Sequence, residues 1–188
     1  MARRGLSFRR RRRMSLEKKQ LIRNYMIGCT SAFLLGVFIV ISFAYTITNV
    51  GFSMEETIAH NQNVLVNRTK YILFAPRVSH VVVFKQGTNE HIYVKRVVAT
   101  PGDSVQIVDG NLYVNDVLVK SQFDKMANAG IAEQRIVLGE DEFFVLGDNR
   151  NDSEDSRSDT MGLIQRDEII GKAWFALPSE TSSMKLVR

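Results

Sequence analysis

The sequence predicts a mainly β domain attached to one N-terminal membrane-spanning helix. Three observations support this fold class. An uncharged stretch covers residues 24–54, short apolar runs of strand type follow it, and helical periodicity is weak beyond it. The chain of 188 residues leaves 140 residues after the apolar stretch, which is enough for one domain with its own core.

The N-terminal region divides by charge. Residues 1–23 contain ten Lys or Arg and one Glu, a net charge of +9, so the rest of the chain carries −4 of the overall +5. Residues 25–45 are predominantly apolar, and about 20 such residues cross a bilayer as a helix. Positive residues stay on the cytoplasmic side. We therefore predict a basic cytoplasmic tail over residues 1–23, a transmembrane signal anchor over 24–48 and an extracytoplasmic domain over 49–188.

Two other interpretations of this region are weaker. A cleavable signal peptide has an apolar core of about 7–15 residues and a small-x-small cleavage site, and the residues around Tyr45 offer no such site. The Arg cluster could bind nucleic acid, but membrane topology already accounts for its charge. The one cysteine, Cys29, lies inside the apolar run, so the exported part is expected to fold without disulfides.

The exported part contains short runs typical of strands. We expect strands over residues 63–67, 78–84, 92–99 and 142–146. A three-stranded meander is expected within residues 104–119, because Asp109-Gly110 suits the two positive-φ positions of a tight hairpin and Asn115-Asp116 follows as a second turn. Residues 121–135 are polar and are predicted to form a loop.

Ser53 and Lys95 are the residues best suited to nucleophilic chemistry. A serine needs a base to become a nucleophile, and a lysine can act as that base only if desolvation lowers its pKa. Strand alternation places Lys95 on one face with Tyr93, Val97 and Ala99, and Arg96 on the other. On position alone, a charged pair that protects an edge strand from aggregation is the simpler interpretation.

A polar segment, residues 147–159, follows the last predicted strand and strengthens the catalytic interpretation. Its Ser153 could bond to a lysine amine, and its Asp148 and Asp155 could pair with arginines. Calcium binding fits poorly, because Arg150 stands where an EF-hand loop needs an oxygen ligand. The three histidines have no metal-ligand spacing, so no metal site is expected, and a His-based triad lacks its Asp partner.

Together these segments resemble the bacterial type I signal peptidases, the membrane-bound Ser/Lys endopeptidases that remove signal peptides from exported proteins. The resemblance runs from the apolar anchor to Phe175. It rests on the serine region, two core strands, the lysine region and the highly specific polar segment, which are residues 51–58, 63–68 with 81–84, 93–103 and 147–157. The short insertion over residues 104–140 is similar to the compact Gram-positive form.

The resemblance implies a partly open β-barrel catalytic domain and a role for each matching residue. Ser53 would be the nucleophile and Lys95 the general base, and the Ser53 backbone N–H would donate to the oxyanion. Gly51 stands where some members carry a side-chain oxyanion donor. The supporting set is Ser153, which orients the Lys95 amine, and the pairs Asp148 with Arg96 and Asp155 with Arg157. Neither a metal nor another cofactor is implied.

Two departures from the family pattern bear on activity. Glu56 replaces a usual proline just after the nucleophile, and Ser79-His80 replaces a usual Gly-Asp. A specialised paralogue is therefore one interpretation, and a non-catalytic factor that assists assembly of surface proteins is the alternative function. A self-cleaving Ser/Lys protease of the repressor type fits poorly with a membrane anchor. The expected partners are membrane-inserted preproteins and the lipid bilayer, without nucleic acid, at the cell membrane.

Overall fold

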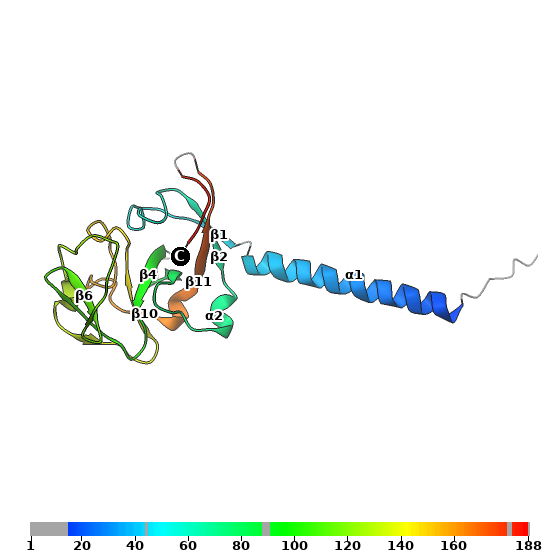
Figure 1. Ribbon diagram of the computed structural model, residues 1–188, viewed down its shortest axis with the longest axis horizontal. Helices are drawn as coiled ribbons and strands as arrows, with labels where there is room; N and C mark the ends of the chain where they lie inside the picture. Colours follow the sequence, from blue (N-terminus) through cyan, green and yellow to red (C-terminus); the bar gives the residue numbers. More distant parts are fainter. Residues whose placement is uncertain (1–14, 44, 88–90, 180–181, 188) are drawn as a thin grey trace, which may run out of the picture. The chain divides into compact units, whose positions relative to one another are not determined.

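The computed structural model describes residues 15–43, 45–87, 91–179 and 182–187. The chain forms two compact units, residues 1–40 and 41–188, which are described separately. Figure 1 colours both along the sequence.

The first unit is a single long helix. Helix α1 spans Leu16–Phe43, and its segment Leu16–Ile41 is long and apolar enough to cross a membrane, with a mean hydropathy of 1.9. It differs from the predicted anchor at both ends. It begins within the predicted basic tail, of which residues 1–14 lie outside the described residues. It ends at Phe43, because Tyr45–Thr48 pairs as strand β1 with β2 instead of continuing the helix.

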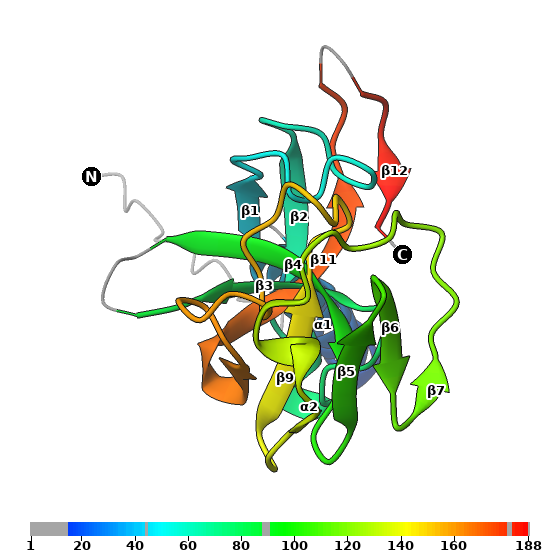
Figure 2. The same cartoon turned by 90° about the vertical axis from the view of Figure 1, so that its left-hand side faces the viewer.

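The second unit is built on one large antiparallel sheet. Its order is β1-β2-β11-β3-β4-β9-β10, with β12 paired to β11. The bounds are β1 Tyr45–Thr48, β2 Asn63–Asn67, β3 Val81–Lys85, β4 Ile92–Ala99, β9 Glu142–Leu146, β10 Ile164–Gln165, β11 Ile169–Ala176 and β12 Lys185–Leu186. Figure 2 shows β3 and β4 crossing the direction of β1 and β2, so the sheet is strongly curled. The end strands β1 and β10 do not pair with each other within the described chain, and the predicted mainly β, partly open barrel is confirmed.

A second, smaller sheet has the order β7-β6-β5-β8. Its strands are β5 Ser104–Val108, β6 Asn111–Val114, β7 Val117–Leu118 and β8 Ile136–Val137. The predicted meander is confirmed, with positive φ at Asp109 (50°) and Gly110 (74°) and again at Asn115 (52°) and Asp116 (63°). Such mirror-image turns match the twist of paired strands.

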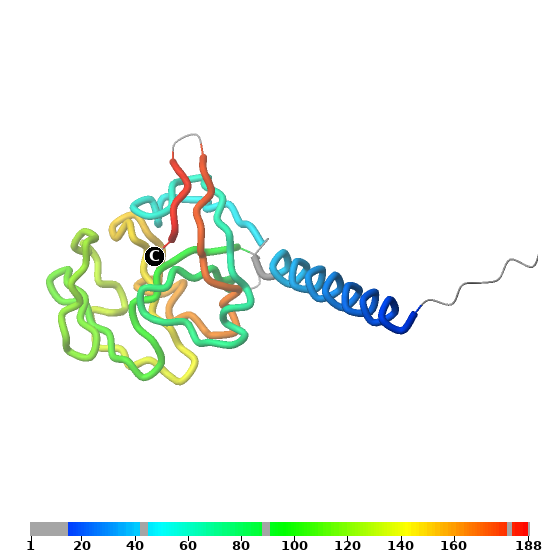
Figure 3. Tube along the Cα trace, turned by 45° about the vertical axis from the view of Figure 1, so that its right-hand side comes forward, coloured from blue at the N-terminus to red at the C-terminus, as the bar shows by residue number. Residues whose placement is uncertain are grey.

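Three short helices complete the described part of the fold. They are α2 Lys70–Leu73, the 3₁₀ helix η1 Gly130–Glu133 and the 3₁₀ helix η2 Arg166–Glu168. Helix η1 lies inside the predicted loop 121–135. Figure 3 shows β12 returning beside β11 at the end of the chain.

Two expectations for the strands are wrong. Strand β3 begins at Val81 rather than Val78, because a turn with Ser79 at φ 70° precedes it. The pairing of β4 with β9 shifts between Val97 and Ala99. Such a bulge adds one residue to one strand, so Ala99 packs in the same core cluster as Val98 and does not share the face of Val97.

Candidate active site

Ser53 lies in a tight turn between β1 and β2. Met54 and Ile58 are fully buried, and the Met54 carbonyl accepts hydrogen bonds from the N–H groups of Thr57 and Ile58. Both buried residues follow Ser53, so they fix the backbone on the C-terminal side of this half-buried serine. At Gly51 the chain takes φ 110°, a value that L-residues rarely adopt.

Lys95 lies at the middle of β4 and is only 3% exposed. Its Nζ donates to Ser153 Oγ at 3.2 Å. Burial lowers the pKa of Lys95 from 10.5 to about 8, although the carboxylates of Asp155 and Glu154 act in the opposite direction. A lysine with this pKa is substantially neutral at mildly alkaline pH and can accept a proton.

The polar segment after β9 contacts both the serine turn and the lysine. Asn149 N–H donates to the Ser53 carbonyl at 3.0 Å. A methyl group on Gly147 would lie 2.2 Å from Ser153 Oγ and 2.6 Å from the Ser53 carbonyl oxygen. Because residue 147 is a glycine, the Ser153 side chain and the Ser53 carbonyl can both pack closely against its backbone.

Two buried ion pairs brace this arrangement. Arg96 Nε and Nη2 donate to the two Asp148 oxygens at 2.7 and 2.6 Å, and Arg157 pairs in the same two-pronged way with Asp155, with its Nε at 2.8 Å from Oδ1. These are the two pairs that the resemblance implied. Asp155 also accepts a bond from Gly147 N–H at 3.0 Å, so the second pair fixes the start of the polar segment. As alternation predicted, Lys95 and Arg96 have different partners.

Thr57 and Phe123 belong to the site although no sequence motif indicated a role for either. The Thr57 hydroxyl bonds to Asp148 Oδ2 and accepts from Arg96 Nη2 at 3.3 Å, so it links the serine turn to the first ion pair. Phe123 lies under two guanidinium groups, with its ring centre 5.5 Å from Arg96 Cζ and 5.0 Å from Arg150 Cζ. The spacing of Thr57, four residues after Ser53 within a turn, is the only signal that could have indicated its role.

The polar segment contacts both the turn that carries the Ser53 hydroxyl and the buried Lys95 amine, which is substantially neutral at mildly alkaline pH. A serine hydroxyl and a neutral amine are the groups that acyl transfer through a serine requires. Within the described part of the chain, no three His, Cys, Asp or Glu side chains lie close enough together to bind a metal ion.

Comparison with known proteins identifies the family. Residues 22–177 match the family described as "Signal peptidase, peptidase S26". The chain belongs to the signal peptidase family. Signal peptidase I of Bacillus amyloliquefaciens is 38% identical over an alignment of 136 residues, and the match covers 66% of this chain and 71% of that protein. Signal peptidase IB of Staphylococcus aureus (strain Mu50 / ATCC 700699) is 34% identical over an alignment of 179 residues, and the match covers 84% of this chain and 90% of the relative.

A solved signal peptidase I from Enterococcus faecalis V583 is also similar. It shares 24% identity with a TM-score of 0.43, and the alignment covers 56% of this chain and 98% of that structure. The family assignment rests on the sequence matches, and it agrees with the resemblance that the motifs indicated.

Glu56, at the position of the usual signal peptidase proline, faces outward. It is exposed and lines a cavity of about 480 Å³ together with Arg96, Arg150 and Lys120. It is not among the charges that shift the pKa of Lys95. The structure therefore favours a solvent-facing carboxylate over one that approaches the lysine.

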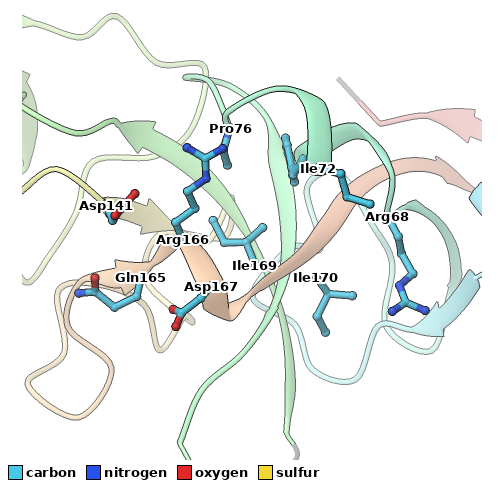
Figure 4. A pocket seen from close by; sticks show the side chains of 10 residues that line it. Arg68, Ile72, Pro76, Asp141, Gln165, Arg166, Asp167, Ile169 and Ile170 are labelled. Atoms are coloured by element: carbon cyan, nitrogen blue, oxygen red, sulfur yellow. The ribbon is translucent and has the colours of Figure 1, made fainter.

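A larger cavity, of about 720 Å³, lies away from Ser53 and Lys95. Figure 4 shows its lining, in which Arg166 and Asp141 lie on one side and Arg68 on the other, with Ile72 and Ile169 between them. It contains none of the residues to which the resemblance gives a role.

Proposed function

We propose that this chain is a signal peptidase that removes N-terminal signal peptides from exported preproteins, with Ser53 as nucleophile and Lys95 as general base. Membership of the signal peptidase family supports the removal of signal peptides. The burial of Lys95 is the observation that supports its role as the base. A lysine with a pKa near 8 that bonds to Ser153, on the segment that also contacts Ser53, suits no simple surface role.

The reaction follows from these groups. The neutral Lys95 amine takes the Ser53 hydroxyl proton while Ser53 Oγ forms a bond to the scissile carbonyl carbon. The carbonyl oxygen becomes an oxyanion that accepts from the Ser53 N–H. The Lys95 ammonium then gives its proton to the leaving amine as the C–N bond breaks, and an acyl-enzyme ester remains. Water, deprotonated by Lys95, hydrolyses the ester and restores Ser53.

The substrate would bind as an added strand. Residues Ile92–Lys95 of β4 pair with β3 on one edge, whereas β9 pairs with β4 only from Arg96 onward within the described residues. The other edge of Ile92–Lys95 is therefore available for an extended peptide, which would lie directly beside Lys95. Shallow pockets there would select small residues at the first and third positions before the cut.

The proposed location is the cell membrane, with α1 as a single-pass anchor, the N-terminus in the cytoplasm and residues 49–188 outside. The length and hydropathy of α1 and the charge division around it support this topology. The substrate's signal peptide would then lie in the same bilayer. The scheme needs no nucleic acid, nucleotide or metal.

The decisive experiment compares the unmodified chain with Ser53→Ala and Lys95→Ala on a preprotein in detergent. We expect each variant to lose cleavage by at least about 10³-fold, and the double variant to be no worse, because the two residues act as one unit. The exposed Ser183→Ala and Lys125→Ala are matched controls that should keep full activity. Substantial activity in Lys95→Ala would remove lysine from the base role.

The non-catalytic alternative, an assembly factor for surface proteins, gains no support from the comparisons. It would be favoured if the unmodified chain bound preproteins without cleaving them.

A further inference from the structure

A buried arginine, Arg150, has no carboxylate partner among the described residues. It is 4% exposed, and its Nε is the one buried side-chain nitrogen or oxygen in the described chain that lacks a hydrogen-bond partner. Its Nη1 contacts Met126 Sδ, a weak acceptor, at 4.0 Å. The other two buried arginines, Arg96 and Arg157, each form a two-pronged pair with a carboxylate. A buried charge normally has such a partner, so Arg150 is a candidate to bind an anion from outside the chain.

An aromatic contact holds Arg150 in place without satisfying its hydrogen-bond donors. The Phe123 ring centre lies 5.0 Å from Arg150 Cζ, a distance at which the ring attracts the cation. Burial lowers the pKa of Arg150, and nearby Asp148 acts in the opposite direction. An arginine in a protein nevertheless keeps its proton. The guanidinium is therefore a permanent charge in surroundings that disfavour it, and an anion beside it would be stabilised.

Arg150 lines the cavity of about 480 Å³ that also contains Glu56. The cavity lies between β4 of the large sheet and β6 of the second sheet, and β12 contributes further lining residues. In Figure 2, β6 and β12 both lie to the right of β4. The charged lining residues are the cations Arg96, Arg150, Lys120 and Lys185 and the single carboxylate Glu56, a formal charge of +3. We call this space the basic cavity.

The excess of positive charge remains after internal pairing is considered. Asp148 neutralises Arg96, which leaves +2. Glu56 is exposed and forms no ion pair with the other cations among the described residues. The larger cavity of about 720 Å³ differs in this respect, because its two arginines are matched by two aspartates (Figure 4). The basic cavity is therefore suited to an anion, whereas the larger one is not.

The basic cavity begins next to the serine turn but does not include the proposed dyad. Thr57 lines it and is four residues after Ser53, and four residues span at most about 14 Å. Neither Ser53 nor Lys95 lines it. The residues of a preprotein before the cut are proposed to lie along Ile92–Lys95. The residues after the cut are therefore the ones free to reach the cavity.

We propose that the basic cavity binds one oxyanion, a carboxylate or a phosphate, with the Arg150 guanidinium as its main donor. Lys120 and Lys185 add charge from other parts of the lining. The oxyanion has two possible sources, an acidic side chain of the preprotein after the cut and a free inorganic anion. The first source rests on the proposed function and would give the enzyme a substrate preference. The second source does not depend on that function.

The first test measures binding of inorganic phosphate to the full chain in detergent. A ligand that binds only the folded state raises Tm as its concentration rises. We expect a saturable rise in Tm with phosphate, compared with chloride at the same ionic strength. Arg150→Gln should weaken phosphate binding by at least about tenfold, because it removes the buried charge. The absence of a saturable rise in the unmodified chain would overturn the proposal.

Further variants keep this test valid if Arg150→Gln does not fold. Lys120→Gln with Lys185→Gln leaves Arg150 in place and should weaken phosphate binding by about threefold, because these lysines are partly solvated. Glu56→Gln removes a repulsive charge and should tighten it. The matched control is Lys125→Gln with Arg135→Gln, two exposed cations outside the cavity, which should bind phosphate as the unmodified chain does. Equal weakening in the control and in the Lys120 and Lys185 double variant would overturn the proposal.

The second test identifies the source of the oxyanion. A single Asp is moved through the first six positions after the cut of a preprotein, with Asn at the same position as the reference. If the preprotein is the source, one position should favour Asp by at least about threefold in kcat/KM. Phosphate should compete with this preference, and it should be lost in Lys120→Gln with Lys185→Gln but kept in Lys125→Gln with Arg135→Gln.

The outcomes of the two tests are distinguishable. Phosphate binding without any preference for Asp would assign the cavity to a free anion. A preference for Asp that survives loss of Lys120 and Lys185 would contradict the preprotein as the source. Complete inactivity of the unmodified chain would refute the proposed peptidase function, whereas phosphate binding would still decide whether the basic cavity is an anion site.

Discussion

Lys95 is buried at a position where charge is costly. Removing water from the ammonium group disfavours the charged form, and this effect outweighs the attraction of Asp155 and Glu154. The result is a pKa of about 8 for a side chain whose ordinary value is 10.5. Burying this group costs the fold free energy, and it leaves Lys95 as a base that is substantially neutral at mildly alkaline pH.

The pH dependence of cleavage should report this pKa. We expect kcat/KM to rise with pH along a limb whose midpoint is about 8, because only neutral Lys95 can take the Ser53 proton. In the unfolded chain the lysine keeps its proton up to about its ordinary pKa of 10.5, so the free energy of unfolding should also rise with pH between about 8 and 10.5. Glu154→Gln removes a charge that favours the ammonium, so it should move the limb to lower pH. A limb near 10.5 would mean that Lys95 is solvated in the working enzyme.

The effect of Glu56 on cleavage can be tested by replacing it with proline. Proline restricts φ and lowers the conformational entropy of the unfolded chain, and the Glu56 N–H that it would remove donates no backbone hydrogen bond to another described residue. Glu56→Pro should therefore stiffen the turn after Ser53 and raise cleavage of a generic preprotein by a few-fold. Because the Glu56 carboxylate does not shift the pKa of Lys95, the pH limb should stay where it is. Loss of activity on a native substrate would instead identify Glu56 as a specificity element.

Strand alternation correctly predicted that Lys95 and Arg96 have different hydrogen-bond partners. The opposite directions of Lys95 and Arg96 follow from the two-residue period of β4, and each has the partner that the motif implied. The contacts of Thr57 and Phe123 were not predicted, because both residues lie in irregular segments whose contacts come from tertiary packing. Only Thr57 had a sequence signal, its spacing after Ser53.

At the scale of elements, the polar segment after β9 organises the site. Val145 N–H donates to Ser156 Oγ at 3.0 Å and Ser156 N–H returns a bond to the Val145 carbonyl at 3.1 Å, so the segment folds back on the strand that leads into it. Because the segment folds back, the Ser153 side chain lies beside Gly147. The Ser53 carbonyl lies beside the same glycine.

Gly147→Ala tests this close approach. The added methyl group would overlap Ser153 Oγ and the Ser53 carbonyl, and neither can move without disturbing the Lys95 bond or the serine turn. We expect a loss of cleavage of at least about 10²-fold and destabilisation of about 1–3 kcal/mol, measured by thermal unfolding. Gly102→Ala is a useful comparison, since open space surrounds that glycine, although its φ of 83° also carries strain. Equal activities of the two variants would argue against a packing role for Gly147.

The elements themselves were predictable to different degrees. The hairpins of the second sheet follow from Asp-Gly and Asn-Asp, whose side chains and backbone tolerate positive φ. Strand β1 was missed because Tyr45–Thr48 continues the apolar run of α1, and only its pairing with β2 separates it from the helix. The bulge in β4 was also missed, since the register with β9 depends on a strand more than forty residues away.

For the whole molecule, the distribution of charge along the chain is informative by itself. A +9 N-terminal region, an uncharged run and a −4 remainder predict a membrane anchor with the N-terminus in the cytoplasm, and this orientation stays a prediction. Fold class was predictable from the same sequence, because strand-like runs and turn signals fill residues 63–146. The order of strands in the large sheet was not, since neighbours such as β2 and β11 come from opposite ends of the domain.

The orientation of the chain in the membrane can be tested by protease protection. If the basic region stays in the cytoplasm, a protease added outside intact spheroplasts should digest the chain beyond about Val50 and spare the Arg-rich tail. The same protease added after lysis should remove both, which controls for intrinsic resistance. Replacing Arg9 to Arg13 by Gln should weaken the orientation and leave a fraction of the domain protected, because the bias depends on the number of Lys and Arg near the span. Protection of the domain in the unmodified chain would place Ser53 in the cytoplasm, where no exported signal peptide presents its cleavage site, and the proposed function would fail with it.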